Sequence, residues 1–153
     1  PHLLEQRLPD LLNEPSVSVE VVDQAIRLGI ELPSTLLQHE KARVRAAAIS
    51  AGLADGKLND FLTPEASSVE AVAATLRCET KTLVSLLADK RWRVRATATR
   101  VLSENRPEDL PMERIRDAAD SDSIGERVAA VELLRNLGES EWLEEKFADT
   151  FQS

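Results

Sequence analysis

The chain of 153 residues carries 27 acidic and 19 basic side chains, which gives it a net charge of −8. An acidic protein repels phosphate backbones at long range, so nucleic acid is disfavoured as its main partner. A single cysteine excludes an internal disulfide and is in keeping with a cytoplasmic location, and no apolar run reaches the roughly 18 residues of a membrane span.

The composition favours helices over sheets. Hydrophobic residues make up 42% of the chain, whereas aromatic residues make up only 3% and tyrosine is absent. Sheets favour aromatic and β-branched residues, so this profile is typical of packed helices. The chain begins at Pro1 and its only methionine is Met112, so we expect a processed chain, a shortened one or a piece of a longer protein.

One basic phrase occurs twice, fifty residues apart. It reads "LLQHEKARVRAAA" at residues 36–48 and "LLADKRWRVRATA" at residues 86–98. The similarity extends over residues 12–48 and 62–98, in which 13 of 37 positions are identical. A period of about 20 to 50 residues indicates stacked structural repeats. We therefore predict repeat units over approximate residue ranges 10–60, 61–108 and 109–138.

The first unit is predicted to hold two main helices. The first helix should end near Gly29, because glycine favours the backbone conformation that follows a helix. A short helical turn with Leu36 and Leu37 follows Pro33, and the second helix comes after a loop. The apolar stripes predicted for the two helices are Val19, Val22 and Ile26, and then Val44, Ala48 and Ala51.

The second and third units follow the same pattern. The stripes of the second unit are Val69, Val72 and Leu76, and then Val94, Ala98, Val101 and Leu102. The third unit ends at Gly138, after a helix with the stripe Val128, Val131, Leu134 and Leu137. An acidic cap helix is predicted over residues 139–151, with a partly apolar face formed by Trp142, Leu143, Lys146 and Phe147. Trp142 is expected to pack against the cap rather than to bind a partner.

The segments "LLADKRWRVRATATRVL" and "DSDSIGERVAAVELLRNLG" resemble HEAT-like repeats of the type also found in phycobilisome lyases. The resemblance covers roughly residues 10–140. It implies an all-α fold, a right-handed α-solenoid of HEAT/armadillo-like helical repeats. From its length, the chain is expected to form a single domain over residues 1–153. In that family an acidic residue and an arginine join a hydrogen-bonded ladder between adjacent repeats. Carried over, the resemblance implies ladder roles for Arg45, Asp89, Arg95 and Arg127.

The chain departs from the pattern of that family at two positions. His39 stands where the second unit has Asp89, and Glu126 stands where a valine should precede Arg127. We expect the ladder to be incomplete at these two places.

A search for catalytic patterns finds almost nothing. The chain has no Gly-rich phosphate loop, no Gly-x-Ser-x-Gly and no Cys/His cluster of metal-ligand spacing. Its histidines are His2 and His39, and His39 is interpreted as a polar loop residue, with a catalytic base as the alternative. Cys78 stands where the first unit has Leu28 and is interpreted as a small buried hydrophobe, with a reactive thiol as the alternative. We therefore expect no enzyme, no cofactor and no metal.

The repeated phrase predicts both a structural joint and a binding surface. Arg43 and Arg93 lie two residues from the predicted ladder arginines, so they point to another side of the helix. Stacked repeats would gather exposed cations along one edge, in a basic ridge formed by Lys41, Arg43, Lys90, Arg91, Trp92 and Arg93. Trp92 suits an interface hot spot, and a tryptophan packed into a gap between repeats is an equal alternative.

The sequence is compatible with three functional hypotheses. The leading hypothesis is a non-catalytic scaffold or adaptor that binds a protein partner through the basic ridge, with the acidic residues 111–153 available to a second, basic surface. The alternative is a nucleic-acid-binding or alkylpurine DNA glycosylase-like HEAT protein, which needs a broad basic surface and aromatic side chains for an exposed base. A bilin lyase subunit is a third hypothesis, which rests on the repeat type alone.

Overall fold

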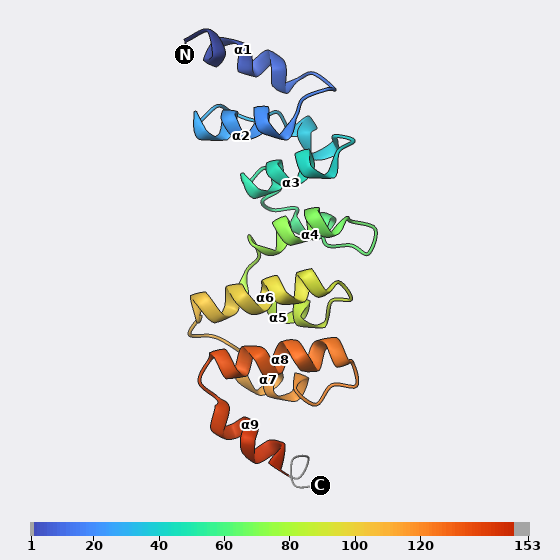
Figure 1. Ribbon diagram of the computed structural model, residues 1–153, viewed down its shortest axis with the longest axis vertical. Coiled ribbons are helices and arrows are strands. Elements are labelled where there is room, and N and C mark those ends of the chain that lie inside the picture. The colour runs from blue at the N-terminus through green and yellow to red at the C-terminus, as the bar shows by residue number, and fades with distance from the viewer. Residues whose placement is uncertain (1, 149–153) are drawn as a thin grey trace. The chain divides into compact units, whose positions relative to one another are not determined.

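The computed structural model describes residues 2–148, and the side chains from Glu5 onward. Every regular element in this part of the chain is a helix, so the fold class is all-α, as predicted (Figure 1). The chain divides after Arg77 into two compact units. From here on they are called the first and the second unit, and they are not the predicted repeat units. The predicted repeat boundaries, near residues 60 and 108, lie elsewhere, and the single domain stays a prediction.

The first unit contains α1 (His2–Leu12), α2 (Val19–Arg27), the 3-10 helix η1 (Ser34–Gln38), α3 (Ala42–Ser50), the 3-10 helix η2 (Leu58–Phe61) and α4 (Ser68–Thr75). At the start of α2, the hydroxyl of Ser18 accepts the backbone N–H of Val21 at 3.4 Å. The helix ends where predicted, because Gly29 adopts a φ of 70° just after it. η1 carries Leu36 and Leu37, which are both buried.

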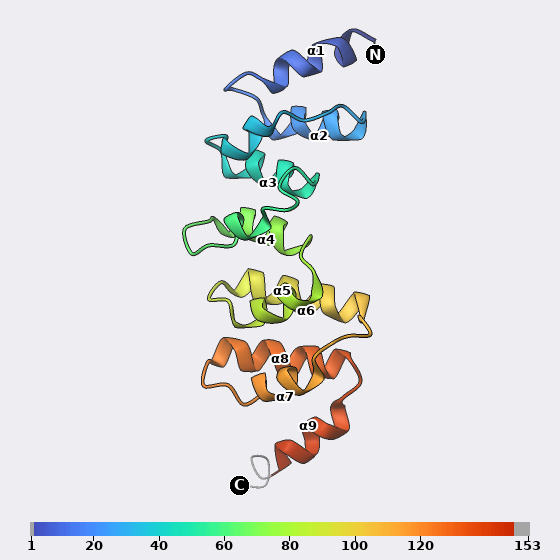
Figure 2. The same cartoon turned by 180° about the vertical axis from the view of Figure 1, so that it is seen from behind.

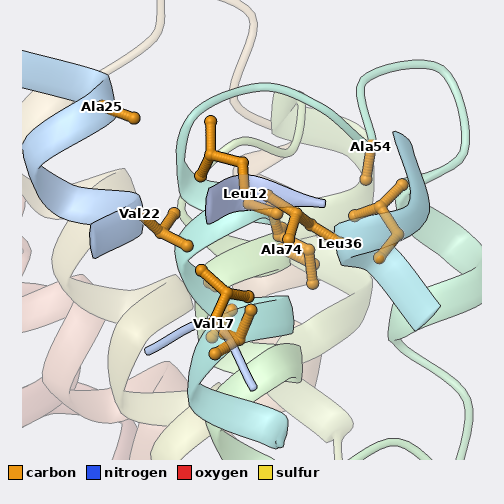
Figure 3. Close-up of a cluster of buried hydrophobic side chains, with 13 residues drawn as sticks. Leu12, Val17, Val22, Ala25, Leu36, Ala54 and Ala74 are labelled. Carbon is orange, nitrogen blue, oxygen red and sulfur yellow. The ribbon is translucent and has the colours of Figure 1, made fainter. Parts of the chain in front are cut away.

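A core of small and aliphatic side chains holds the first unit together (Figure 3). α3 lies at its centre and packs against α2, η1 and α4. The side chains of Ala25, Ala48 and Ala74 are fully buried, and their small size lets these helices approach closely. Leu36 and Ile49 fill the space between them, and full burial of such a side chain contributes about 1.5–3 kcal/mol.

The second unit contains α5 (Thr80–Ser85), the 3-10 helix η3 (Leu86–Ala88), α6 (Trp92–Asn105), α7 (Met112–Ala118), α8 (Ile124–Asn136) and α9 (Ser140–Lys146). α6 and α8 lie side by side and begin at the same end, and α5 and α7 lie on one side of this pair (Figures 1 and 2). Gly138 follows α8 with a φ of 86°, as predicted. The predicted cap helix ends earlier than residue 151, at Lys146, and residues 149–151 lie outside the described part.

Several predicted apolar stripes are wrong at some of their positions, although members such as Val22, Val94 and Leu134 are buried as predicted. In α4, Val69 and Leu76 are 42% and 44% exposed, and the buried face is formed instead by Glu70, Ala71, Ala73, Ala74 and Thr75. In α8, Val128 is 60% exposed, whereas Ala129, Ala130, Leu133 and Leu134 are buried. Ile26 and Ala51 are also exposed. Small alanines pack closest to neighbouring helices, so the larger apolar residues beside them turn outward.

Candidate functional site

The loops that precede α3, α6 and α8 share one arrangement, here named the loop clamp. In each loop, one side chain accepts the backbone N–H of the residue two positions on, over 2.9–3.1 Å. The backbone carbonyl of the same residue accepts a hydrogen bond from an arginine six positions on. The accepting residues are His39, Asp89 and Ser121, and the arginines are Arg45, Arg95 and Arg127.

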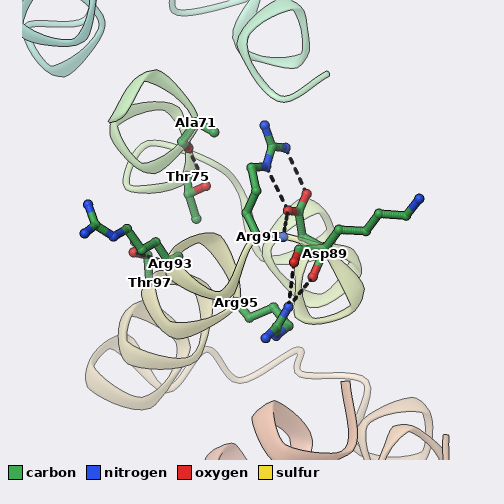
Figure 4. A network of polar contacts seen from close by, with 8 residues as sticks. Ala71, Thr75, Asp89, Arg91, Arg93, Arg95 and Thr97 are labelled. Carbon is green, nitrogen blue, oxygen red and sulfur yellow. Dashed lines mark hydrogen bonds and ion pairs between the residues drawn. The ribbon is translucent and has the colours of Figure 1, made fainter. Parts of the chain in front are cut away.

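The loop clamp explains why the basic phrase is repeated. Each arginine ties the first turn of a helix to the loop before it, and Arg95 also donates to the carbonyl of Lys90 at 3.0 Å (Figure 4). The pairing differs from the ladder that the resemblance implied. Arg95 Nη1 binds the backbone carbonyl of Asp89 at 2.9 Å, whereas the carboxylate of Asp89 binds Arg91. His39 takes the place of Asp89 in its own loop clamp, as the sequence suggested.

Arg45 extends its loop clamp to the next helix of the first unit. Its Nη2 donates to Oε1 of Glu70 at 2.8 Å, and the hydroxyl of Ser67 donates to the same oxygen at 2.9 Å. Glu70 is only 6% exposed. The hydrogen bond from Arg45 outweighs the effect of burial, so the pKa of the Glu70 carboxyl lies below its usual value.

Sequence reasoning missed Glu70, although a local signal was present. Ser67 and Glu70 have the spacing of a capping box, in which the serine hydroxyl accepts the backbone N–H of the glutamate. The carboxylate is turned toward Arg45 and supports a contact between helices. Arg77 was also missed, and it forms a bidentate pair with Asp55, with both contacts at 2.7 Å.

Arg91 is not the free cation that the basic ridge required. Its Nε and Nη2 donate to the two carboxylate oxygens of Asp89 at 2.9 and 3.0 Å, and its side chain is only 17% exposed (Figure 4). Burial raises the pKa of the Asp89 carboxyl, but the hydrogen bonds and charge of Arg91 outweigh it, so that pKa is lowered. The prediction that Arg91 is an exposed side chain is therefore wrong, because its own loop supplies a carboxylate.

Trp92 is the large apolar side chain among the predicted binding residues, and it is exposed. It is 64% exposed, so the alternative of a tryptophan packed between repeats is wrong. The guanidinium carbon of Arg93 lies 5.3 Å from the centroid of its ring, within the range of a cation–π contact. Lys90 is exposed as well. Figure 4 shows the side chain of Arg93 pointing away from Arg91 and Arg95.

The remaining members of the predicted basic ridge are Lys41 and Arg43. Both are exposed and lie at the start of α3, in the first unit, whereas the other four belong to the second unit. A single ridge that joins all six residues therefore stays a prediction. The described geometry supports a smaller group, in which Lys90, Trp92 and Arg93 lie at the start of α6.

The second unit also carries a hollow beside α8. Its volume is about 460 Å³, and its lining comprises Ala119, Arg127, Val128, Val131, Glu132, Arg135 and Phe147. Trp142 of α9 is half-buried, and the guanidinium carbon of Arg116 lies 5.7 Å from its ring centroid. These contacts agree with the expected packing role of Trp142.

The candidate catalytic groups His39 and Cys78 belong to different units. Nδ1 of His39 accepts the backbone N–H of Lys41, and Nε2 lies 2.9 Å from the carbonyl oxygen of Pro15, so both ring nitrogens are engaged by backbone groups. Cys78 is half-buried rather than fully buried. Burial, with the nearby charge of Glu79, raises the pKa of its thiol and reduces its reactivity. The side chain of His2 lies outside the described residues.

The described residues offer neither a group of metal-binding side chains nor a helix that could span a membrane. No three side chains of the metal-binding types gather there in a group that could hold an ion. None of the described helices has the length and apolar character needed to span a membrane.

Comparisons with known proteins leave the family open. No family model matches the chain, and no curated protein or solved structure matches it significantly. The resemblance to HEAT-like repeats therefore stays a prediction that rests on the two quoted segments. The features that bear on function are the all-α fold, the loop clamps and the exposed residues around Trp92.

Proposed function

We propose that the chain is a non-catalytic, cytoplasmic protein-binding module, a HEAT-like α-solenoid that binds a protein partner through the surface around Trp92. The observation that carries this proposal is the exposed Trp92 stacked by Arg93. Tryptophan and arginine are the residue types most enriched at interface hot spots, since each buries a large area on binding. A tryptophan that is 64% exposed leaves much apolar surface for a partner to cover.

Charge supports a protein partner over nucleic acid. Arg91 is neutralised by Asp89, which leaves Lys90 and Arg93 as the cations beside Trp92. Two cations in a chain with a net charge of −8 give a weak field for a phosphate backbone, which is normally bound by many neutralising contacts. Lys41 and Arg43 are candidates for a further contact, and the acidic residues 111–153 are candidates for a basic surface.

The test is affinity capture from the source cells, with and without nuclease, followed by binding measurements with the purified captured protein. The binding variant is Trp92→Ala with Arg93→Glu, and the control is Lys81→Glu, an exposed charge on α5 of the same unit. We expect the binding variant to weaken affinity about tenfold or more, and the control to leave it unchanged. Capture of nucleic acid in place of a protein, or equal binding by wild type and binding variant, would contradict the proposal.

A further inference from the structure

The three most exposed large apolar side chains in the described part of the chain lie on two neighbouring helices. Ile124 is 69% exposed, Trp92 is 64% exposed and Val128 is 60% exposed, whereas the next such residue, Leu76, is 44% exposed. Trp92 begins α6, and Ile124 begins α8 with Val128 one turn further along. These three residues are named the apolar strip.

The two parts of the apolar strip belong to one surface. α6 and α8 lie side by side and begin at the same end (Figures 1 and 2). Their first turns touch, since a Cβ added at Gly125 would lie 2.7 Å from the guanidinium carbon of Arg95. The opposite faces of the two helices supply the core, through buried side chains such as Val94 and Leu133. The apolar strip is therefore turned away from the core.

The charges beside the apolar strip differ between the two helices. Lys90, Arg93 and Arg100 are exposed on the side of α6, and among the described residues none of these cations takes part in an ion pair. Asp122, Glu132 and Arg135 are exposed on the side of α8. A partner that lies along the strip thus meets the positive charges of Lys90 and Arg93 beside Trp92, and charges of both signs beside α8.

We propose that the apolar strip binds an amphipathic helix of a protein partner, with the carboxylates of that helix against Lys90 and Arg93. This inference rests on the proposed function and specifies its partner. Neighbouring helices pack about 8–10 Å apart, and residues four apart on one helix lie about 6 Å apart. An apolar stripe on a helix presents side chains at similar spacings.

A helix suits this surface better than an extended peptide does. Beyond their first turns, the backbone groups of α6 and α8 are engaged within the helices, so they offer no continuous edge to which a strand could be added. A helix satisfies its own backbone hydrogen bonds, so it can press an apolar face against the strip without leaving buried polar groups unpaired.

The experiment is a selection from a displayed library of helical peptides, carried out with the whole chain as the target. We expect the enriched peptides to share an apolar stripe flanked on one side by Asp or Glu. Val128→Asp and Arg93→Glu should each weaken their binding about tenfold or more. The matched control is Val69→Asp, which changes an exposed valine of α4 and should leave binding unchanged. When the flanking Asp or Glu of the peptide is replaced by lysine, binding to the Arg93→Glu variant should be restored.

Other outcomes separate this inference from the proposed function. Enrichment of peptides without an apolar stripe, or no enrichment, overturns the inference, and so does binding that is insensitive to Val128→Asp. If the captured protein partner loses affinity with Trp92→Ala and Arg93→Glu but not with Val128→Asp, the proposed function stands and the helix-binding strip is wrong. If none of these substitutions affects the partner, both are wrong. Circular dichroism of each variant shows whether helicity is intact.

Discussion

The guanidinium of Arg45 joins a loop to a neighbouring helix in the first unit. Its Nη1 donates to the carbonyl of His39, and its Nη2 donates to Oε1 of Glu70 at 2.8 Å. The side chains of Arg45 and Glu70 are 22% and 8% exposed. A charge this well shielded from water depends on its partner, so the pair couples the loop clamp to the packing of α4.

The first prediction concerns the strength of this pair. Arg45→Ala should destabilise the chain by about 3 kcal/mol, because it leaves the Glu70 carboxylate buried without its cation. A double-mutant cycle with Glu70→Ala should give a coupling of about 1–3 kcal/mol in urea unfolding. The control is the exposed pair of Arg77 and Asp55, whose side chains are 35% and 52% exposed and whose coupling should be clearly smaller, because water screens it. Equal couplings for the two pairs would contradict the role of burial.

The second prediction concerns pH. The pKa of Glu70 is lowered in the folded chain, mainly by its hydrogen bond from Arg45, relative to a usual value of 4.5. The stability that this carboxylate contributes is therefore fully present above about pH 4.5, and it is lost as the pH falls through the lower, folded pKa. The difference in unfolding free energy between wild type and Glu70→Gln should shrink on acidification. If the difference grows below that pH, the pKa of Glu70 is not lowered in the folded chain.

The third prediction concerns Gly125, against which the guanidinium of Arg95 lies. Gly125→Ala should displace that guanidinium from the carbonyls of Asp89 and Lys90, at a cost of about 1 kcal/mol or more. In an Arg95→Ala background the same substitution should stabilise α8 by up to about 1 kcal/mol, because alanine favours a helix over glycine. Thermal unfolding of the wild type, the two single variants and the double variant checks this reversal of sign. The same sign in both backgrounds would mean that Arg95 does not occupy this position.

The fourth prediction concerns the histidine in the first loop clamp. Because Nδ1 of His39 accepts the backbone N–H of Lys41, the neutral ring should carry its proton on Nε2, where it is donated to Pro15. Ring nitrogen NMR identifies this tautomer directly. His39→Ala should cost about 1 kcal/mol or more, whereas His39→Asp should cost less, since Asp89 fills the same role in the second unit. Equal losses for the two variants would contradict the equivalence of the two loops.

The fifth prediction concerns the two tryptophans. With Trp142→Phe, the remaining Trp92 should emit like indole in water, and acrylamide should quench it almost equally in folded and unfolded chains, because it is 64% exposed. With Trp92→Phe, the remaining Trp142 is half-buried and faces Arg116, so unfolding should increase its quenching. Strong protection of Trp92 in the folded chain would remove the basis of the proposed binding surface.

Local chemistry was sufficient to predict the ends of two helices and the start of a third element. Gly29 and Gly138 end α2 and α8 because a residue without a Cβ adopts positive φ at little cost. Pro33 precedes η1, and its buried Leu36 and Leu37 were predicted from the same short segment. These features depend on neighbours in the sequence, so the sequence carries them.

The outward turn of Val128 and Val69 could not be predicted in this way. In an alanine-rich helix, several faces are apolar enough to be buried, and an i, i+3, i+7 pattern does not choose between them. In the closely packed structure, the alanines are buried against neighbouring helices and these two valines are in contact with water. The apolar strip, on which the proposed helix partner depends, exists only because of that choice.

By itself, the sequence determined that this protein is helical, where two of its helices end, and that the basic phrase recurs. Only the tertiary structure decided what each cation of the phrase does. Arg45 reaches a buried glutamate, Arg91 a carboxylate in its own loop and Arg93 the ring of Trp92. The physical reason is that a guanidinium acts through the groups within a few ångströms of it, and folding places those groups there.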